Sequence, residues 1–173
     1  DTGVPIGNYI SQYSGNIYLS DFDHRVKEVY HIKHYFRYMD DMVFLSSSKE
    51  ELQNLIKEIT KYLADEYDLK VKDSWSLFRV EDRGIDFVGY VFRHDSIRLR
   101  KSIAHSIKKT SSKIRWRVNN DMELNRHLYF SFNSLKGWLK HSHSGWLKIR
   151  YFDIIEDHVQ DYHDRFLVKH KEV

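Results

Sequence analysis

The sequence predicts an α+β fold, in which a small antiparallel sheet with helices on one face is followed by an all-helical region. Residues 33–46 consist of two apolar, strand-like halves around Asp40 and Asp41, a pattern typical of a β-hairpin. Residues 49–63 carry apolar side chains with a period of about 3.6 residues, which predicts an amphipathic helix. The pattern from residue 101 onward is helical throughout, so mixed and helical parts follow one another along the chain.

The first hundred residues hold the mixed part of the fold. Glycines and the only proline crowd residues 3–7, which indicates a turn, and residues 8–18 favour an amphipathic helix. Ser48 and Glu51 have the spacing of a capping box, which marks the start of a helix. The apolar face of that helix consists of Leu52, Leu55, Ile56, Ile59 and Leu63.

Short strands and then helices are predicted for the rest of the chain. The strands are expected over residues 69–72, 76–80, 85–92 and 97–99, the last two joined by a turn at 94–96. We place a domain boundary near residue 100, so that residues 1–100 form the first domain and residues 101–173 the second. Within the second domain, breaks between helices are expected at residues 119–121 and 142–145.

Composition excludes several classes of protein. Hydrophobic residues make up 41% of the 173 residues, enough for a core and too many for a disordered chain. Cysteine is absent from the sequence, so there is neither a disulfide framework nor a thiolate metal site. We find no stretch of about 20 apolar residues and no signal peptide, and we expect a cytoplasmic protein without a membrane partner.

Charge is distributed unevenly along the chain. Residues 1–97 contain 12 Lys and Arg against 17 Asp and Glu, whereas residues 98–173 contain 16 against 8. Residues 98–117 contain no acidic residue, so their charges cannot be neutralised by pairs along one helix. This predicts a surface for a polyanion, with a solvated helix face as the alternative. The predicted nucleic-acid contacts are Arg98, Arg100, Lys101, Lys108, Lys109, Lys113, Arg115 and Arg117.

The two adjacent acids in the predicted hairpin are unusual. A tight turn favours Asn-Gly or Asp-Gly, so turn chemistry does not account for Asp40 and Asp41. Two neighbouring carboxylates repel each other unless a cation is present. Mg²⁺ (or Mn²⁺) accepts carboxylate oxygens together with substrate phosphates, and two such ions can activate a hydroxyl and stabilise a leaving pyrophosphate. The alternative is a solvent-exposed acidic turn.

Four motifs, in one order, resemble those of reverse transcriptases. Tyr38-Met39-Asp40-Asp41 is similar to their Y-x-D-D signature. The stretch GVPIGNYISQ at residues 3–12 resembles the motif before it, in the form found in bacterial retroelements of the diversity-generating and group II intron type. GIDFVGY at 84–90 resembles the primer-grip hairpin, and SLKGWLKH at 134–141 a helix of the thumb. The resemblance implies a partial polymerase palm over residues 1–100 and a thumb over 101–173.

The resemblance also implies a role for individual residues. Asp40 would be a metal ligand and Asp41 its weaker partner, and both would be catalytic. Gly7, Ser11 and Gln12 would line the floor beneath the templating base and the nucleotide, with Tyr38 and Met39 under the primer terminus; Gly89 and Tyr90 would hold the primer strand. The partners would be an RNA template, a DNA primer and a deoxynucleoside triphosphate.

The sequence also departs from the family. Its members carry a further metal-binding Asp and the triphosphate-binding fingers before the turn at residues 3–7, where this chain begins. Asp21 and Asp23 are not expected to replace that Asp, and we interpret them as capping or ion-pairing residues. Trp75 stands where the family often has a Lys, so Lys70 or Lys72 becomes the candidate proton donor to pyrophosphate.

These departures favour a fragment of a bacterial or mobile-element reverse transcriptase. We expect the isolated chain to be inactive in primer extension and to self-associate, either through the edge of its hairpin or by exchange of its amino-terminal segment. The alternatives are a non-catalytic nucleic-acid-binding palm–thumb module or a degenerate remnant. A metal-dependent phosphodiesterase or cyclase would also place paired acids on a hairpin, but it would not account for the motif at residues 3–12 or for the basic helices.

Overall fold

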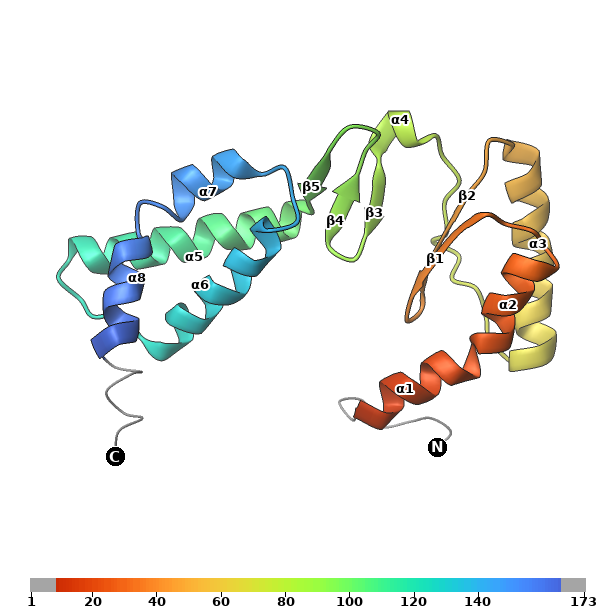
Figure 1. Cartoon of the computed structure of the whole chain (residues 1–173), viewed down its shortest axis with the longest axis horizontal. Coiled ribbons are helices and arrows are strands. Elements are labelled where there is room, and N and C mark those ends of the chain that lie inside the picture. Colours follow the sequence, from red (N-terminus) through yellow and green to blue (C-terminus); the bar gives the residue numbers. More distant parts are fainter. Residues whose placement is uncertain (1–8, 166–173) are drawn as a thin grey trace. The chain divides into compact units, whose positions relative to one another are not determined.

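The computed structural model describes residues 9–165, apart from the side chains of Tyr9 and Gln12. The chain forms two compact units, an amino-terminal unit (Asp1–Phe78) and a carboxyl-terminal unit (Arg79–Val173). Both contain helices and small antiparallel sheets, which confirms the predicted α+β class (Figure 1). None of the described helices is long and apolar enough to cross a membrane.

The amino-terminal unit is a two-stranded hairpin with helices against one face. Its elements are α1 (Tyr9–Tyr18), α2 (Ser20–Glu28), β1 (His34–Tyr38), β2 (Asp41–Leu45) and α3 (Lys49–Tyr67). The strands are antiparallel, with Tyr35 opposite Phe44 and Tyr38 opposite Asp41. The hairpin predicted for residues 33–46 is therefore confirmed. The helix predicted for residues 8–18 is also confirmed, and it corresponds to α1.

The core of this unit lies between the hairpin and helices α2 and α3. Phe22 and Val26 of α2 are fully buried, and Tyr35 stacks on Phe44 with ring centroids 4.9 Å apart. Helix α3 contributes the buried Leu55, Ile59 and Leu63, with Leu52 partly buried beside them. Its apolar face therefore packs as the sequence period predicts.

The start of α3 confirms one half of the predicted capping box. The Ser48 hydroxyl accepts a hydrogen bond from the Glu51 backbone N–H at 3.2 Å. The Glu51 carboxylate, however, binds the Ser46 hydroxyl, and Ser46 Oγ in turn accepts from the Ser48 N–H at 3.0 Å. The reciprocal contact thus runs through Ser46 rather than directly.

The strands predicted at residues 69–72 and 76–80 are wrong. Asp68 has a φ of 51° and ends α3, after which the chain runs irregularly to the short helix α4 (Val80–Arg83). In the part of the chain that the structure describes, neither segment pairs with another strand. Without a paired neighbour, an extended segment gains no ladder of hydrogen bonds.

The carboxyl-terminal unit consists of a three-stranded sheet followed by helices. The strands, in the order β3-β4-β5, are antiparallel, and α5 runs directly from β5. The elements after α4 are β3 (Ile85–Phe87), β4 (Tyr90–Phe92), β5 (Ile97–Leu99), α5 (Lys101–Asn119), α6 (Arg126–Leu139), α7 (Gly145–Tyr151) and α8 (Glu156–His163). The predicted helix breaks at 119–121 and 142–145 both occur.

One predicted strand is corrected in this unit, and the predicted domain boundary falls within it. The strand predicted over residues 85–92 is a hairpin of two strands, because Val88 (φ 48°) and Gly89 (φ 82°) form a turn between them. The compact units divide between Phe78 and Arg79, so the domain boundary predicted near residue 100 lies inside the second unit. The reason is that the β3–β5 sheet packs against α5 and α6, through contacts such as that of Tyr90 with Trp138 (centroids 5.3 Å apart).

The helices of this unit enclose their own core. Ile107 and Ile114 of α5 and Phe132 of α6 are buried, and Phe132 contacts Phe152 with centroids 4.6 Å apart. The spacing of Ile107 and Ile114 is two helical turns, so the opposite face of α5 is left for its basic residues.

Gly89 has a structural role that can be tested. A Cβ at this position would lie 2.5 Å from the Trp138 ring and 2.9 Å from Ile103, on a backbone with φ 82°. Replacing Gly89 with Ala is expected to lower the free energy of unfolding by about 2 to 4 kcal/mol, through backbone strain and overpacking. Urea denaturation measures this difference.

Gly137 provides the matched control. It lies inside α6, and a Cβ there would meet nothing within 4 Å. Ala is the better helix former by about 1 kcal/mol, so Gly137→Ala is expected to stabilise the protein slightly. Equal effects of the two substitutions would contradict the proposed contact of Gly89 with Trp138.

Candidate active site

The tip of the β1–β2 hairpin carries both carboxylates. Tyr38 pairs with Asp41, so Met39 and Asp40 form a two-residue turn between the strands. The backbone φ is 56° at Met39 and is not positive at Asp40. A turn with positive φ at its first central residue normally has Gly there, so Met39 holds a conformation that costs about 1 to 3 kcal/mol. The strain therefore falls on Met39, while Asp40 and Asp41 are exposed to solvent.

Alternation along the strands gives the hairpin two different faces. Tyr35 lies on the face that packs against the helices, so Arg37 lies on the same face two residues later. Phe36 and Tyr38 lie on the opposite, open face, where each is about half exposed. Asp41 is opposite Tyr38 and shares that open face. The tip thus combines an aromatic platform with acidic side chains.

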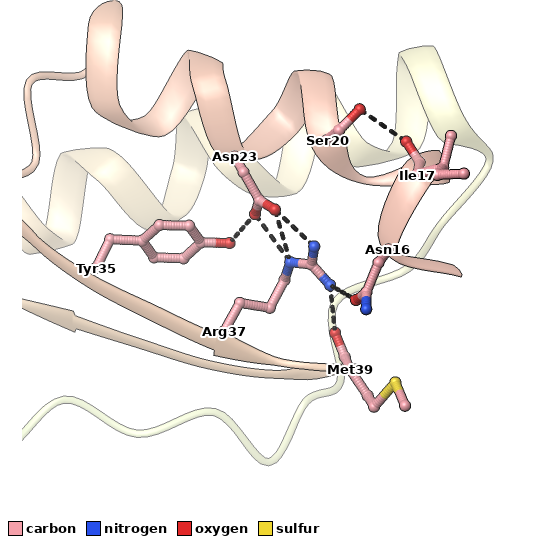
Figure 2. A network of polar contacts seen from close by, with 7 residues as sticks. All are labelled: Asn16, Ile17, Ser20, Asp23, Tyr35, Arg37 and Met39. Atoms are coloured by element: carbon pink, nitrogen blue, oxygen red, sulfur yellow. Dashed lines mark hydrogen bonds and ion pairs between the residues drawn. The ribbon is translucent and has the colours of Figure 1, made fainter. Parts of the chain in front are cut away.

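Arg37 is the centre of a polar network on the inward face (Figure 2). Its Nη2 donates to Asp23 Oδ2 at 2.5 Å, and its Nε donates to Asp23 Oδ1 at 2.8 Å. The Tyr35 hydroxyl donates to the same carboxylate at 2.7 Å. Through Nη1, Arg37 also reaches the Asn16 side-chain oxygen and the Met39 carbonyl, both at 3.2 Å.

The pKa values in this network follow from its contacts. Burial alone would raise the pKa of Asp23, but the hydrogen bonds from Arg37 and Tyr35 together lower it. The hydrogen bond to Asp23 raises the pKa of Arg37. The pKa of Tyr35 is raised as well, chiefly by burial and in addition by the hydrogen bond to Asp23. All three groups therefore keep their ordinary charge at neutral pH.

This network positions the turn. The bond from Arg37 to the Met39 carbonyl holds the strained residue, and the bond to Asp23 joins the turn to α2. Asp23 is an ion-pairing residue, which confirms its interpretation from sequence. Arg37 itself was missed. A charged residue at an inward position of an alternating strand requires a partner for its charge. The position of Arg37, two residues after Tyr35 in the predicted strand, could have indicated such a partner.

Lys72 forms an ion pair with one of the two exposed carboxylates. Its Nζ lies 2.8 Å from Asp40 Oδ2, although the two side chains are 72% and 74% exposed. Hydrogen bonds from Lys72 and from the Asp40 backbone amide lower the pKa of Asp40. The hydrogen bond to Asp40 raises the pKa of Lys72, and the charge of Asp41 adds to the effect. The tip is thus a place where a positive charge is stabilised.

A divalent metal ion fits this chemistry. Asp40 and Asp41 offer the hard oxygen ligands that Mg²⁺ prefers, and the ammonium of Lys72 already stands beside them as a cation. Within residues 9–165, no cluster of three or more acidic or His side chains is arranged to hold a metal. The hairpin can therefore supply two ligands of a metal site.

Comparison with known proteins identifies the family. The sequence model of reverse transcriptase (RNA-dependent DNA polymerase) matches residues 1–92, which is more than half of the chain. This chain belongs to the reverse transcriptase family. No curated protein matches it. The matched residues include the Tyr38-Met39-Asp40-Asp41 hairpin and extend through β4.

The other residues assigned by resemblance to reverse transcriptases lie in different places. Gly7 lies outside the described residues, and so does the side chain of Gln12, whereas Ser11 is half-buried on α1. Gly89 and Tyr90 belong to the carboxyl-terminal unit. Gly89 is buried beside Trp138, and the Tyr90 hydroxyl donates to the Trp138 carbonyl at 3.2 Å. Tyr90 therefore contributes to packing whatever its role with a primer.

The basic residues of 98–117 fall into two groups. Three arginines have partners within the unit: Arg100 with Asp86 at 2.7 Å, Arg115 with the Arg150 carbonyl at 3.3 Å and Arg117 with the Glu123 carbonyl at 2.8 Å. The remaining residues are exposed on β5 and α5, and they are Arg98, Lys101, Lys108, Lys109 and Lys113. Arg98 and the four lysines of α5 are thus the exposed part of the predicted polyanion surface.

The role of Arg37 can be tested by substitution. Arg37→Met leaves the half-buried Asp23 without its cation and the Met39 carbonyl without its donor. The free energy of unfolding is expected to fall by about 2 kcal/mol at pH 7, less than for a fully buried pair. Because the folded pKa of Asp23 is lowered, its stabilisation is present above the ordinary pKa and is lost as the pH falls through the folded value. Urea denaturation at neutral and acidic pH measures both effects.

Arg79→Met is the matched control, because Arg79 is exposed and pairs with Glu81 only at 3.7 Å. It is expected to change stability by about 0.5 kcal/mol or less. Arg37→Met should also weaken the dependence of stability on acidic pH, whereas Arg79→Met should not. If both variants kept the wild-type pH dependence, the ion pair of Arg37 with Asp23 would not contribute as argued.

Proposed function

We propose that this chain is the carboxyl-terminal palm and thumb part of a bacterial reverse transcriptase of the diversity-generating or group II intron type. The observation that carries the proposal is the strained Met39 turn, which is held by Arg37 and presents Asp40 and Asp41 to solvent. The family match over residues 1–92 supports the same reaction, namely RNA-templated transfer of nucleotides to a primer.

Asp40 would be the principal ligand of Mg²⁺ or Mn²⁺ and Asp41 the weaker one. When bound, the metal would activate the primer 3′-hydroxyl and neutralise charge on the leaving pyrophosphate. The role of Arg37 is to hold the turn, so that Asp40 needs no reorganisation when substrate arrives. Tyr38, on the open face, would lie beneath the primer terminus. Two carboxylates are few for two metal ions, so a further carboxylate is required.

Lys72 would serve this site as a proton donor. Its ammonium lies 2.8 Å from Asp40, and its raised pKa keeps it protonated at neutral pH. An ammonium that leaves Asp40 when a metal binds is available to give a proton to a pyrophosphate oxygen. This geometry favours Lys72 over Lys70, which pairs with Asp73 at 3.7 Å.

The thumb would bind the template–primer duplex. Exposed lysines of α5 would contact phosphates of an A-form-like hybrid, which depends on charge and shape rather than on base sequence. Gly89 and Tyr90 would approach the primer strand from the β3–β4 hairpin.

The test is RNA-templated primer extension. The chain is joined at residue 3 to the fingers and first palm strand of a characterised reverse transcriptase, and extension of oligo(dT) on poly(rA) is measured with Mg²⁺. The joined enzyme is expected to synthesise DNA, whereas this chain alone is expected to leave the primer unextended. A folded joined enzyme that binds template–primer but makes no DNA would contradict the proposed function.

A further inference from the structure

A depression on the carboxyl-terminal unit lies between the second half of α5 and the start of α6. It has a volume of about 560 Å³ and is open to solvent. Lys109, Lys113 and Trp116 line it from α5, and Asn125 and His127 line it from the opposite side. The turn that leads out of α5 contains Asp121 (φ 50°) and a hydrogen bond from the Met122 N–H to the Arg117 carbonyl at 2.9 Å.

The α5 wall combines an aromatic ring with positive charges. Residues 109, 113 and 116 are spaced by four and three positions, which places them on one helix face. Trp116 is 59% exposed, and the core of the unit therefore does not account for it. Bases stack on such rings, while neighbouring ammonium groups bind the phosphates on either side.

Trp146 shows that exposure alone does not make such a site. It is 56% exposed on α7, but it does not line the depression, and the Lys108 ammonium lies 5.8 Å from its ring centroid. Trp138, the remaining tryptophan of this unit, packs on Tyr90 and beside Gly89. Of these three tryptophans, only Trp116 is both exposed and part of a depression that is lined by lysines.

We propose that this depression binds one unpaired nucleotide of a single-stranded nucleic acid, with the base stacked on Trp116 and the adjoining phosphates on Lys109 and Lys113. A base can stack on a side chain only when it has left its own duplex stack, so the nucleotide at Trp116 is unpaired, whereas the lysines can also bind the phosphates of the hybrid. The inference rests on the proposed function, to which it adds a site for unpaired template or primer. RNA and DNA share the chemistry used here, and separate ligands distinguish them.

The experiment uses the whole chain and three fluorescent ligands: a short oligo(dT), a short oligo(U) and a blunt RNA–DNA hybrid. Fluorescence anisotropy measures each affinity for the wild type and for Trp116→Ala, Trp116→Phe and Trp146→Ala. Trp116→Ala is expected to weaken single-strand binding by about 5- to 150-fold. Trp116→Phe should keep most of that affinity, and Trp146→Ala should change it by about twofold or less, because only a ring in the depression is required.

Binding of the hybrid is the readout that separates the two proposals. If Trp116→Ala leaves single-strand affinity unchanged while the hybrid still binds, the stacking site is wrong and the proposed function stands. Equal losses for Trp116→Ala and Trp146→Ala, or equal losses for single strand and hybrid, would also overturn the site. A larger loss for oligo(U) than for oligo(dT) supports the site with RNA as its ligand, and the reverse supports it with DNA. Loss of templated synthesis with intact single-strand binding would count against the proposed function only.

Discussion

Replacing Asp40 with Asn is expected to reduce RNA-templated DNA synthesis by the joined enzyme to background, a fall of about a thousandfold or more. The amide keeps the size of the side chain but removes the negative charge that a metal requires. Asp40 lies at the tip and is 74% exposed, so the substitution leaves the core of the unit untouched. The loss should therefore appear in the rate, with little change in stability.

Two controls define the specificity of this effect. Asp41→Asn is expected to reduce synthesis less than Asp40→Asn, because Asp41 is proposed as the weaker ligand. Asp73→Asn removes a carboxylate that is even more exposed than Asp40, at 92%, from the segment that also carries Lys72, and it should leave the rate unchanged. A rate for Asp40→Asn that equals the rate for Asp73→Asn would show that the hairpin tip does not act in catalysis.

Reversing the charge of three lysines on α5 is expected to abolish nucleic-acid binding by this chain. Lys108, Lys109 and Lys113 are exposed and lie in a helix that has no acidic residue to offset them. Each phosphate contact contributes about 0.7 to 0.9 to the slope of log K against log salt, so the triple Glu variant should lose about 2 to 3 in slope. Titration of an RNA–DNA hybrid at several salt concentrations measures both affinity and slope.

The matched control for this prediction lies in the other unit. Lys49, Lys57 and Lys61 are exposed on α3, and their replacement by Glu changes the net charge by the same amount. This control variant is expected to keep most of the affinity, and Asp40→Asn should not weaken binding at all. If the affinity did not depend on salt and the α5 triple variant kept it, the basic face of α5 would not be a nucleic-acid contact.

Local signals in the sequence were sufficient for several elements. The period of Leu55, Ile59 and Leu63 predicts α3 and its buried face. The apolar pattern of a helix is repeated over several turns, so it stays recognisable even if one position does not fit. The apolar halves around Asp40 predict the hairpin with its tip in the right place. Four motifs in order pointed to the family, which the match over residues 1–92 confirms.

The parts that sequence reasoning missed depend on contacts between distant residues. Arg37 is explained by Asp23, which is on another element, and Lys72 meets Asp40 from a segment that was expected to be a strand. The turn at Gly89 was not visible in the apolar pattern of residues 85–92, because short apolar runs do not show where a strand reverses. Only the resemblance to the primer-grip hairpin placed a hairpin at residues 84–90. For Arg37 and Lys72 the deciding partner lies outside the window over which a sequence pattern can be recognised.

Binding of Mn²⁺ at the hairpin tip tests the central claim most directly. Paramagnetic broadening of backbone amide signals is recorded for the wild-type chain and for Asp40→Asn as Mn²⁺ is added, and Mg²⁺ is then used as competitor. In the wild type, we expect the signals of Met39, Asp40 and Asp41 to broaden first and to recover when Mg²⁺ is added. In Asp40→Asn, the amide signals at the tip should not broaden when Mn²⁺ is added. Broadening that is spread evenly over the exposed acidic residues, or that is unchanged by Asp40→Asn, would contradict a metal site at the tip.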